Sequence, residues 1–96
     1  MPEDITDFTE EQERARRNLV LAAWAITDWF PHNHHAWAVI SALYPKPVKN
    51  FPGPTILTEY AREILKTPRT EVFADLQERF AWAWDAFKEA FPPRDR

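Results

Sequence analysis

The sequence predicts an all-α fold, a single-domain bundle of about four helices in the order long, short, short, long. Nine prolines and a single glycine fall almost wholly between helix-like runs. Within those runs the apolar residues recur at intervals of three and four, which is the period of a helix packed on one side. A chain of 96 residues has room for one domain, and 45% hydrophobic residues suit a buried core. We therefore expect residues 1–96 to form one helical domain.

The first helix is expected over residues 10–30, after an acidic leader over residues 1–8. Thr9 and Gln12 have the spacing of a capping box, in which each side chain bonds the other residue's backbone amide. Pro31 ends the helix because it lacks an amide donor. The stripe expected to face the core comprises Ala15, Leu19, Ala22, Ala23, Ile26 and Phe30.

The second helix is expected over residues 34–44, capped by Asn33. Its buried side should hold Ala36, Val39, Ile40 and Leu43. Pro45 and Pro47 end it, since the residue before a proline disfavours the helical region. Residues 45–54 contain four prolines and are expected to form a stiff linker to the third helix.

The two remaining helices have equally clear start signals. Thr55 is expected to cap the third, whose amphipathic stripe comprises Leu57, Tyr60, Ala61, Ile64 and Leu65. Thr67 followed by Pro68 should start the fourth, because proline suits the first helical position. This helix can continue to Phe91, before the prolines at 92–93. Its core seam comprises Phe73, Leu76, Phe80, Ala83, Phe87 and Ala90.

Five tryptophans, seven phenylalanines and two tyrosines make this tryptophan-rich chain more aromatic than so small a domain readily buries. On the first helix, Leu21 and Trp24 fall opposite the core stripe, near Arg17. On the fourth, Trp82 falls opposite the seam and near Arg79. Tryptophan is enriched at interface hot spots. We therefore expect a partner to contact Leu21, Trp24, Trp82, Arg17 and Arg79.

Three arrangements could accommodate these aromatic faces. The other helices could cover both faces of the first helix and leave Trp82 half-buried beneath the linker, a homodimer could bury them, or a different protein could bind there. The favoured function is a non-enzymatic protein–protein interaction module, such as an adaptor, an assembly subunit or a stoichiometric inhibitor. Trp82→Ala separates the alternatives, since it destabilises the fold if Trp82 is core and weakens association if it is interface.

A nucleic-acid-associated regulator is the alternative function. Its contacts would come from a local basic patch around the linker and the end of the third helix, namely Lys46, Lys49, Phe51, Lys66 and Arg69. The lysines and the arginine would follow a phosphate backbone while the phenylalanine stacks on a base. The formal net charge of −3 disfavours this alternative.

Metal binding at His32, His34 and His35 is the third hypothesis, because imidazole is a common ligand for zinc, copper and nickel. The sequence lacks both the HExxH motif and a Glu-x-x-His pair, which place ligands one helical turn apart. No cofactor is expected.

Catalysis is not expected either. The chain has no cysteine, and its one glycine lies between two prolines rather than in a phosphate-binding loop. Ser41, the only serine, falls within an apolar helix, where we expect it to be buried or bonded to the backbone. Glu59 and Glu63 are expected to pair with Arg62 and Lys66 on a solvated face.

The composition also bears on location. The acidic N-terminal segment lacks the basic start and apolar stretch of a signal peptide. The longest apolar run, residues 19–26, has eight residues, against the roughly 20 that span a bilayer. With no cysteines to form disulfides, the sequence favours a cytoplasmic protein that does not bind membranes.

Overall fold

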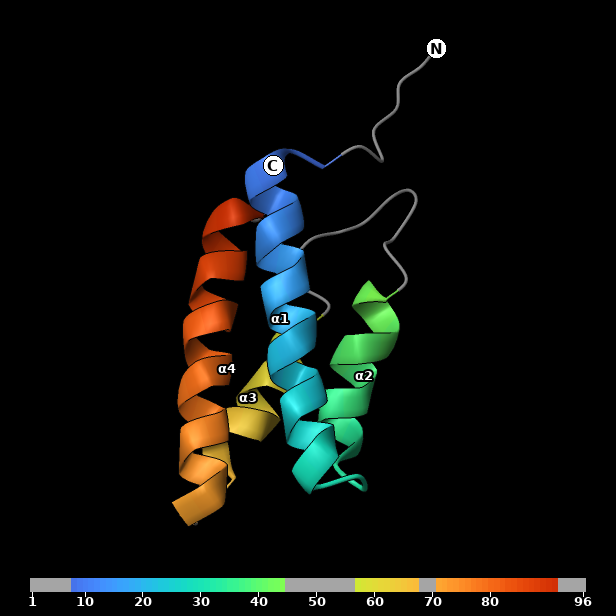
Figure 1. Ribbon diagram of the computed structural model, residues 1–96, viewed down its shortest axis with the longest axis vertical. Coiled ribbons are helices and arrows are strands. Elements are labelled where there is room, and N and C mark those ends of the chain that lie inside the picture. The colour runs from blue at the N-terminus through green and yellow to red at the C-terminus, as the bar shows by residue number, and fades with distance from the viewer. Residues whose placement is uncertain (1–7, 45–56, 68–70, 92–96) are drawn as a thin grey trace.

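The computed structural model describes residues 8–44, 57–67 and 71–91, and within these ranges it contains four α-helices and no strand (Figure 1). They are α1 (Glu10–Trp29), α2 (His34–Leu43), α3 (Thr58–Lys66) and α4 (Glu71–Ala90). In chain order, the first and last helices therefore have 20 residues each, and the two between them have 10 and 9 residues. The predicted all-α bundle and its order of long, short, short and long helices are confirmed.

The start of α1 carries the predicted capping box and also connects α1 to α4. Thr9 Oγ1 accepts from the Gln12 amide at 3.0 Å, and Gln12 Oε1 accepts from the Thr9 amide at 3.1 Å. The side-chain nitrogen of Gln12 also donates to the Ala90 carbonyl at 3.0 Å. At the opposite end of α1, the Phe30 ring lies 5.1 Å from the Phe73 ring in an edge-to-face arrangement. The two long helices are therefore antiparallel and aligned along most of their length.

The turn into α2 is held by side chains at both of its ends. Asn33 is the N-cap, as predicted, and its Oδ1 accepts from the Ala36 amide at 3.0 Å. The indole nitrogen of Trp37 donates to the Pro31 carbonyl at 2.8 Å. This bond explains why Trp37 sits on the turn although its side chain is partly exposed.

The prediction that Thr55 caps the third helix is wrong. Helix α3 begins at Thr58, and its N-cap is Leu57, which makes no side-chain capping bond. Leu57 is fully buried, so packing in the core, rather than a polar cap, sets where this helix starts. Thr55 itself lies outside the described residues.

The remaining helix ends differ little from the predictions. Helices α1, α2 and α4 each end one residue earlier than predicted. Thr67, which was expected to start the fourth helix, is instead the C-cap of α3, and its hydroxyl donates to the Glu63 carbonyl at 2.8 Å. Helix α4 begins at Glu71. The predicted N-terminal Pro68 of the fourth helix lies outside the described residues, as do the leader up to residue 7 and the 45–54 linker.

Each helix packs against two others. Helix α1 lies between α2 and α4, and α3 contacts α2 and α4 from behind α1 in the view of Figure 1. The largest side chains at the centre include Phe80, Phe87, Leu19, Ile26, Leu43, Leu57 and Ile64. Among the helices that the structure describes, none combines the length and the apolar character needed to cross a membrane.

Candidate protein interaction surface

Leu21 and Trp82 lie at the same level on neighbouring helices. Gln12 meets Ala90 at one end of the α1/α4 pair and Phe30 meets Phe73 at the other. Both helices rise by the same distance per residue. Between these contacts, moving one residue forward along α1 therefore reaches the level of the preceding residue of α4. This register places Leu21 of α1 beside the level of Trp82 of α4.

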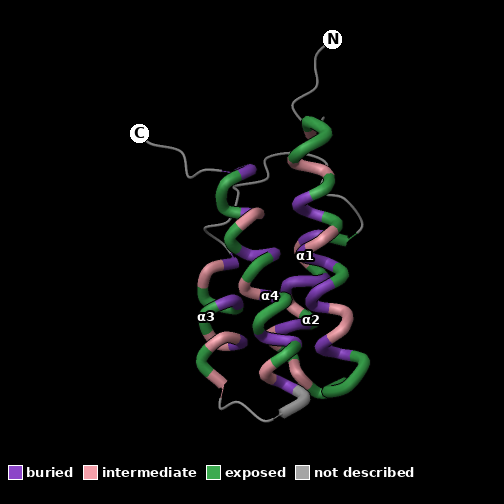
Figure 2. The backbone as a smooth tube through the Cα atoms, turned by 60° about the vertical axis from the view of Figure 1, so that its left-hand side comes forward, coloured by how far each residue is buried: buried purple, intermediate pink, exposed green. Residues whose placement is uncertain are grey.

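The side of the α1/α4 pair that points away from the bundle carries large exposed apolar side chains. The exposed fractions are 55% for Leu21, 64% for Trp29 and 63% for Trp82. Neither α2 nor α3 covers this side, because α2 packs beside α1 and α3 lies behind the pair (Figure 1). Exposed stretches of both helices alternate with buried ones in Figure 2. We call this surface the outer face and define it by Leu21, Ala25, Trp29, Trp82 and Ala86.

Charged side chains of both signs surround the outer face. Arg14 and Asp28 of α1 and Asp75 and Arg79 of α4 are exposed, and none of the four forms an ion pair within the part of the chain that the structure describes. Arg17 lies on the edge of α1 nearer α2, where its guanidinium is 3.6 Å from the Glu13 carboxylate. The charged side chains around the outer face are therefore available to pair with charges on a partner.

Trp82 is 63% exposed, so the helices that the structure describes leave most of it uncovered, while the linker that was expected to half-bury it lies outside the described residues. Trp24, by contrast, is half-buried on the α2 side of α1, with its ring 5.2 Å from that of Tyr44. The structure thus leaves Leu21 and Trp82 exposed at the same level of neighbouring helices but does not place Trp24 on the outer face. Trp84 is buried and stacks on Phe87, close to the core seam.

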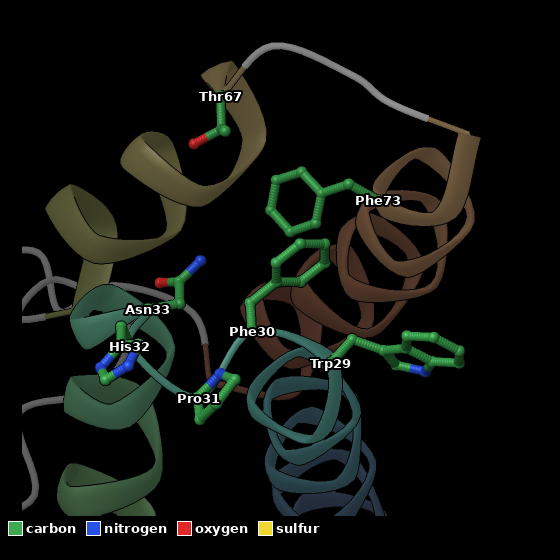
Figure 3. A pocket seen from close by; sticks show the side chains of 7 residues that line it. All are labelled: Trp29, Phe30, Pro31, His32, Asn33, Thr67 and Phe73. Atoms are coloured by element: carbon green, nitrogen blue, oxygen red, sulfur yellow. The ribbon is translucent and has the colours of Figure 1, made fainter.

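Trp29 is a member of the outer face that the sequence reasoning missed. It is the last residue of α1, and its indole lies beside the start of α4 (Figure 3). A signal for it was present in the sequence, since Leu21, Ala25 and Trp29 follow one another at intervals of four on one side of a helix.

The candidate nucleic-acid contacts are mostly beyond the described ranges. Lys46, Lys49, Phe51 and Arg69 lie outside the described residues. Lys66 is placed, and its ammonium group is 3.2 Å from the Glu63 carboxylate. Its charge is therefore already partly balanced by a neighbour on α3.

The three histidines lie near the turn between α1 and α2. The rings of His34 and His35 are 4.4 Å apart between centroids, and the His35 ring also lies 6.4 Å from that of Tyr60. His32 is exposed and faces a cavity instead. Within the described ranges, no three side chains of His, Cys, Asp or Glu gather closely enough to hold a metal ion.

A cavity of about 440 Å³ opens where the ends of α1 and α3 meet the start of α4 (Figure 3). Its lining comprises Trp29, Phe30, Pro31, His32, Asn33, Thr67 and Phe73. Asn33 Oδ1 and the Thr67 hydroxyl hydrogen are already bonded within the chain. His32 is the one titratable side chain among the lining residues, so they provide no acid–base pair. The cavity has the size of a small-ligand pocket and suits an apolar group.

The other residues considered for catalysis lie at the surface. Ser41 is exposed on α2, so of the two expectations for it, burial or a bond to the backbone, burial is wrong. The reason is its position on the side of the helix that faces away from α1 and α3. On α3, Arg62 lies 4.0 Å from Glu59 in an exposed ion pair, as predicted.

Comparisons with known proteins give no relative: no protein-family model, no curated protein and no solved structure matches this chain.

Proposed function

We propose that this protein is a non-enzymatic interaction module that binds another protein chain on the outer face. The observation that carries the proposal is that Leu21, Trp29 and Trp82 are each more than half exposed on two adjacent antiparallel helices. Exposed apolar groups of this size, surrounded by charges, are typical of protein docking surfaces. We further propose that the protein acts in the cytoplasm, as an adaptor, an assembly subunit or a stoichiometric inhibitor.

Trp82 is the side chain on which we expect binding to depend most. With 63% of it exposed, a partner can cover on the order of 150 Å² of indole surface, worth roughly 3–4 kcal/mol before the costs of association. The indole nitrogen can keep one hydrogen bond at the edge of the contact. The charges of Arg79 and Asp75 nearby would then orient the partner.

Replacement of Trp82 by alanine should abolish binding while leaving the fold intact. We expect affinity purification of the tagged variant from its own source to recover less than about a tenth of the partner, because a central tryptophan contributes several kcal/mol. Stability should change by less than about 1 kcal/mol, since Trp82 is mostly solvated. Mass spectrometry of nuclease-treated eluates measures recovery, and urea unfolding measures stability.

Tyr60→Ala is the matched control, because Tyr60 is an exposed aromatic residue on α3, away from the outer face. Partner recovery should be unchanged in this variant. Equal losses with both variants, or a partner that disappears after nuclease treatment, would contradict the proposal. A loss of several kcal/mol in Trp82→Ala would instead assign Trp82 to the core.

A further inference from the structure

We infer that the chain bound on the outer face is a second copy of this protein, packed antiparallel on the first about a two-fold axis at the level of Leu21 and Trp82. The inference rests on the proposed function and names its partner. Three properties of the outer face lead to it: the symmetry of its charges, the position of its apolar centre and its area.

The charges along α1 are arranged symmetrically about Leu21. Arg14 lies seven residues before Leu21 and Asp28 seven residues after it. Seven residues are close to two helical turns, so the three side chains follow one stripe with a drift of about 20° per step. Arg14 and Asp28 are exposed, and neither has an ion pair in the described ranges. At roughly 21 Å apart along the helix, they cannot pair within one chain.

A second copy laid antiparallel on the first satisfies both charges. A two-fold axis running across α1 and α4 through Leu21 and Trp82 places each α1 against the α1 of the other copy. Arg14 then faces Asp28 of the second copy, and Asp28 faces its Arg14, which gives two equivalent ion pairs around a Leu21–Leu21 contact. Laying the two α1 helices parallel to each other would instead bring like charges together. The sequence of charges on α1 therefore selects the antiparallel dimer.

Helix α4 adds apolar area to this interface, but its charges do not favour one orientation of the two copies over the other. The same axis brings Trp82 against Trp82 of the second copy. Arg79 and Asp85 lie three residues on either side of Trp82 and would oppose each other, although Asp85 already pairs with Lys88 at 3.6 Å. Asp75 and Glu89 lie seven residues on either side and would oppose as like charges. The favourable and unfavourable pairs roughly cancel, so α1 sets the orientation.

The outer face is large enough for a weak but specific dimer. Two helices of 20 residues, each about 30 Å long and about 10 Å wide, present roughly 600 Å². Two copies would bury about 1,200 Å² in total, the lower end of the range for stable interfaces. An interface of this size suits a weak, reversible dimer.

Charge reversal tests the antiparallel pairing directly. Arg14→Glu places two carboxylates opposite two others, and Asp28→Lys places two cations opposite two others, so each variant alone should dimerise at least about tenfold more weakly than the natural chain. Mixed together, the two variants should associate with nearly natural affinity, because every contact again joins opposite charges. Sedimentation velocity at low ionic strength measures the natural chain, each variant alone and the mixture. Arg62→Glu, an exposed charge on α3, is the control and should leave dimerisation unchanged.

The outcomes separate this inference from the proposed function. A natural chain that stays monomeric at millimolar concentration, or variants whose mixture remains monomeric, would overturn the antiparallel dimer. If that monomer still recovers a partner in a Trp82-dependent manner, the outer face remains a docking surface for a different protein. A dimer that Trp82→Ala leaves unchanged would overturn both. Circular dichroism of each variant confirms that it folds, and the recovery of affinity on mixing cannot arise from unfolding.

Discussion

Replacement of Arg16 by alanine is expected to lower the free energy of unfolding by about 3 kcal/mol, a large fraction of the stability of a domain this size. Arg16 is buried although it is charged. Its Nη1 donates to the Leu43 carbonyl at 2.7 Å, while Nε and Nη2 donate to the Glu13 carboxylate at 3.2 and 2.6 Å. One side chain therefore connects the first turns of α1 to the last turn of α2.

The size of the effect follows from what the substitution leaves behind. The Leu43 carbonyl lies in the last turn of α2, where backbone carbonyls have no partner within the helix. Without the guanidinium this carbonyl stays buried and unbonded, and the partly buried Glu13 carboxylate loses its closest cation. A positive charge near the C-terminal end of α2 is also lost.

Urea unfolding, followed by tryptophan fluorescence at a concentration where the chain is monomeric, measures this change. We expect the midpoint of thermal unfolding to fall by roughly 10–20 °C in parallel. Arg17→Ala is the matched control, because Arg17 contacts the same Glu13 carboxylate from an exposed position and should cost about 0.5 kcal/mol. Equal losses in the two variants would show that the contact with Leu43 contributes nothing.

Local signals in the sequence predicted most of the fold. The capping box at Thr9 and Gln12 and the cap at Asn33 involve residues three apart, so they form wherever the helix begins. Pro31 marks the end of α1 for the same local reason. The start of α3 was predicted wrongly because Leu57, a residue without a capping group, is fixed there by burial against other helices.

The outer face could be predicted only in part. Helical periodicity placed Leu21 and Trp82 opposite the core, and both are exposed. The same periodicity could not show that α2 covers the side of α1 that carries Trp24, since that depends on where Tyr44 lies in the folded chain. Nor could it show that Leu21 and Trp82 share a level, which follows from the register of two helices far apart in sequence.

Arg16, Thr27 and Gln77 are buried polar side chains that sequence reasoning passed over, and two of them bond to residues far away in the chain. The partners of Arg16 include a carbonyl 27 residues away, and those of Gln77 are 10 and 13 residues away. No spacing rule predicts such bonds. A signal existed for Gln77, because it lies four residues after Phe73 and three before Phe80, inside the apolar seam. A polar residue at that position indicates a buried hydrogen bond.

Gln77, like Arg16, is expected to tolerate replacement poorly. It is fully buried, and its side-chain nitrogen donates to the Ile64 carbonyl at 2.8 Å and to the Thr67 carbonyl at 2.9 Å. These bonds give hydrogen-bond partners to backbone carbonyls at the C-terminal end of α3, and they attach that end to α4. Gln77→Leu should cost about 2 kcal/mol. The loss is not larger because Gln77 Oε1 is itself buried without a hydrogen-bond partner among the described residues, and leucine removes that acceptor too.

Gln77→Glu should be far more destabilising at neutral pH, by at least about 4 kcal/mol, because an ionised carboxylate would face two carbonyl oxygens in the core. Burial raises the pKa of such a carboxyl above its value in the unfolded chain, and its protonated form keeps one donor for a carbonyl. The variant should therefore be most stable, relative to the natural chain, below the pKa of the glutamate in the unfolded chain, which is about 4. It should lose that stability as the pH rises to the pKa of the glutamate in the folded chain. Urea unfolding across this range measures the difference.

Gln77→Leu has no titrating group and should keep a constant difference from the natural chain. A glutamate variant that follows the leucine variant at every pH would show that position 77 does not face the carbonyls of α3.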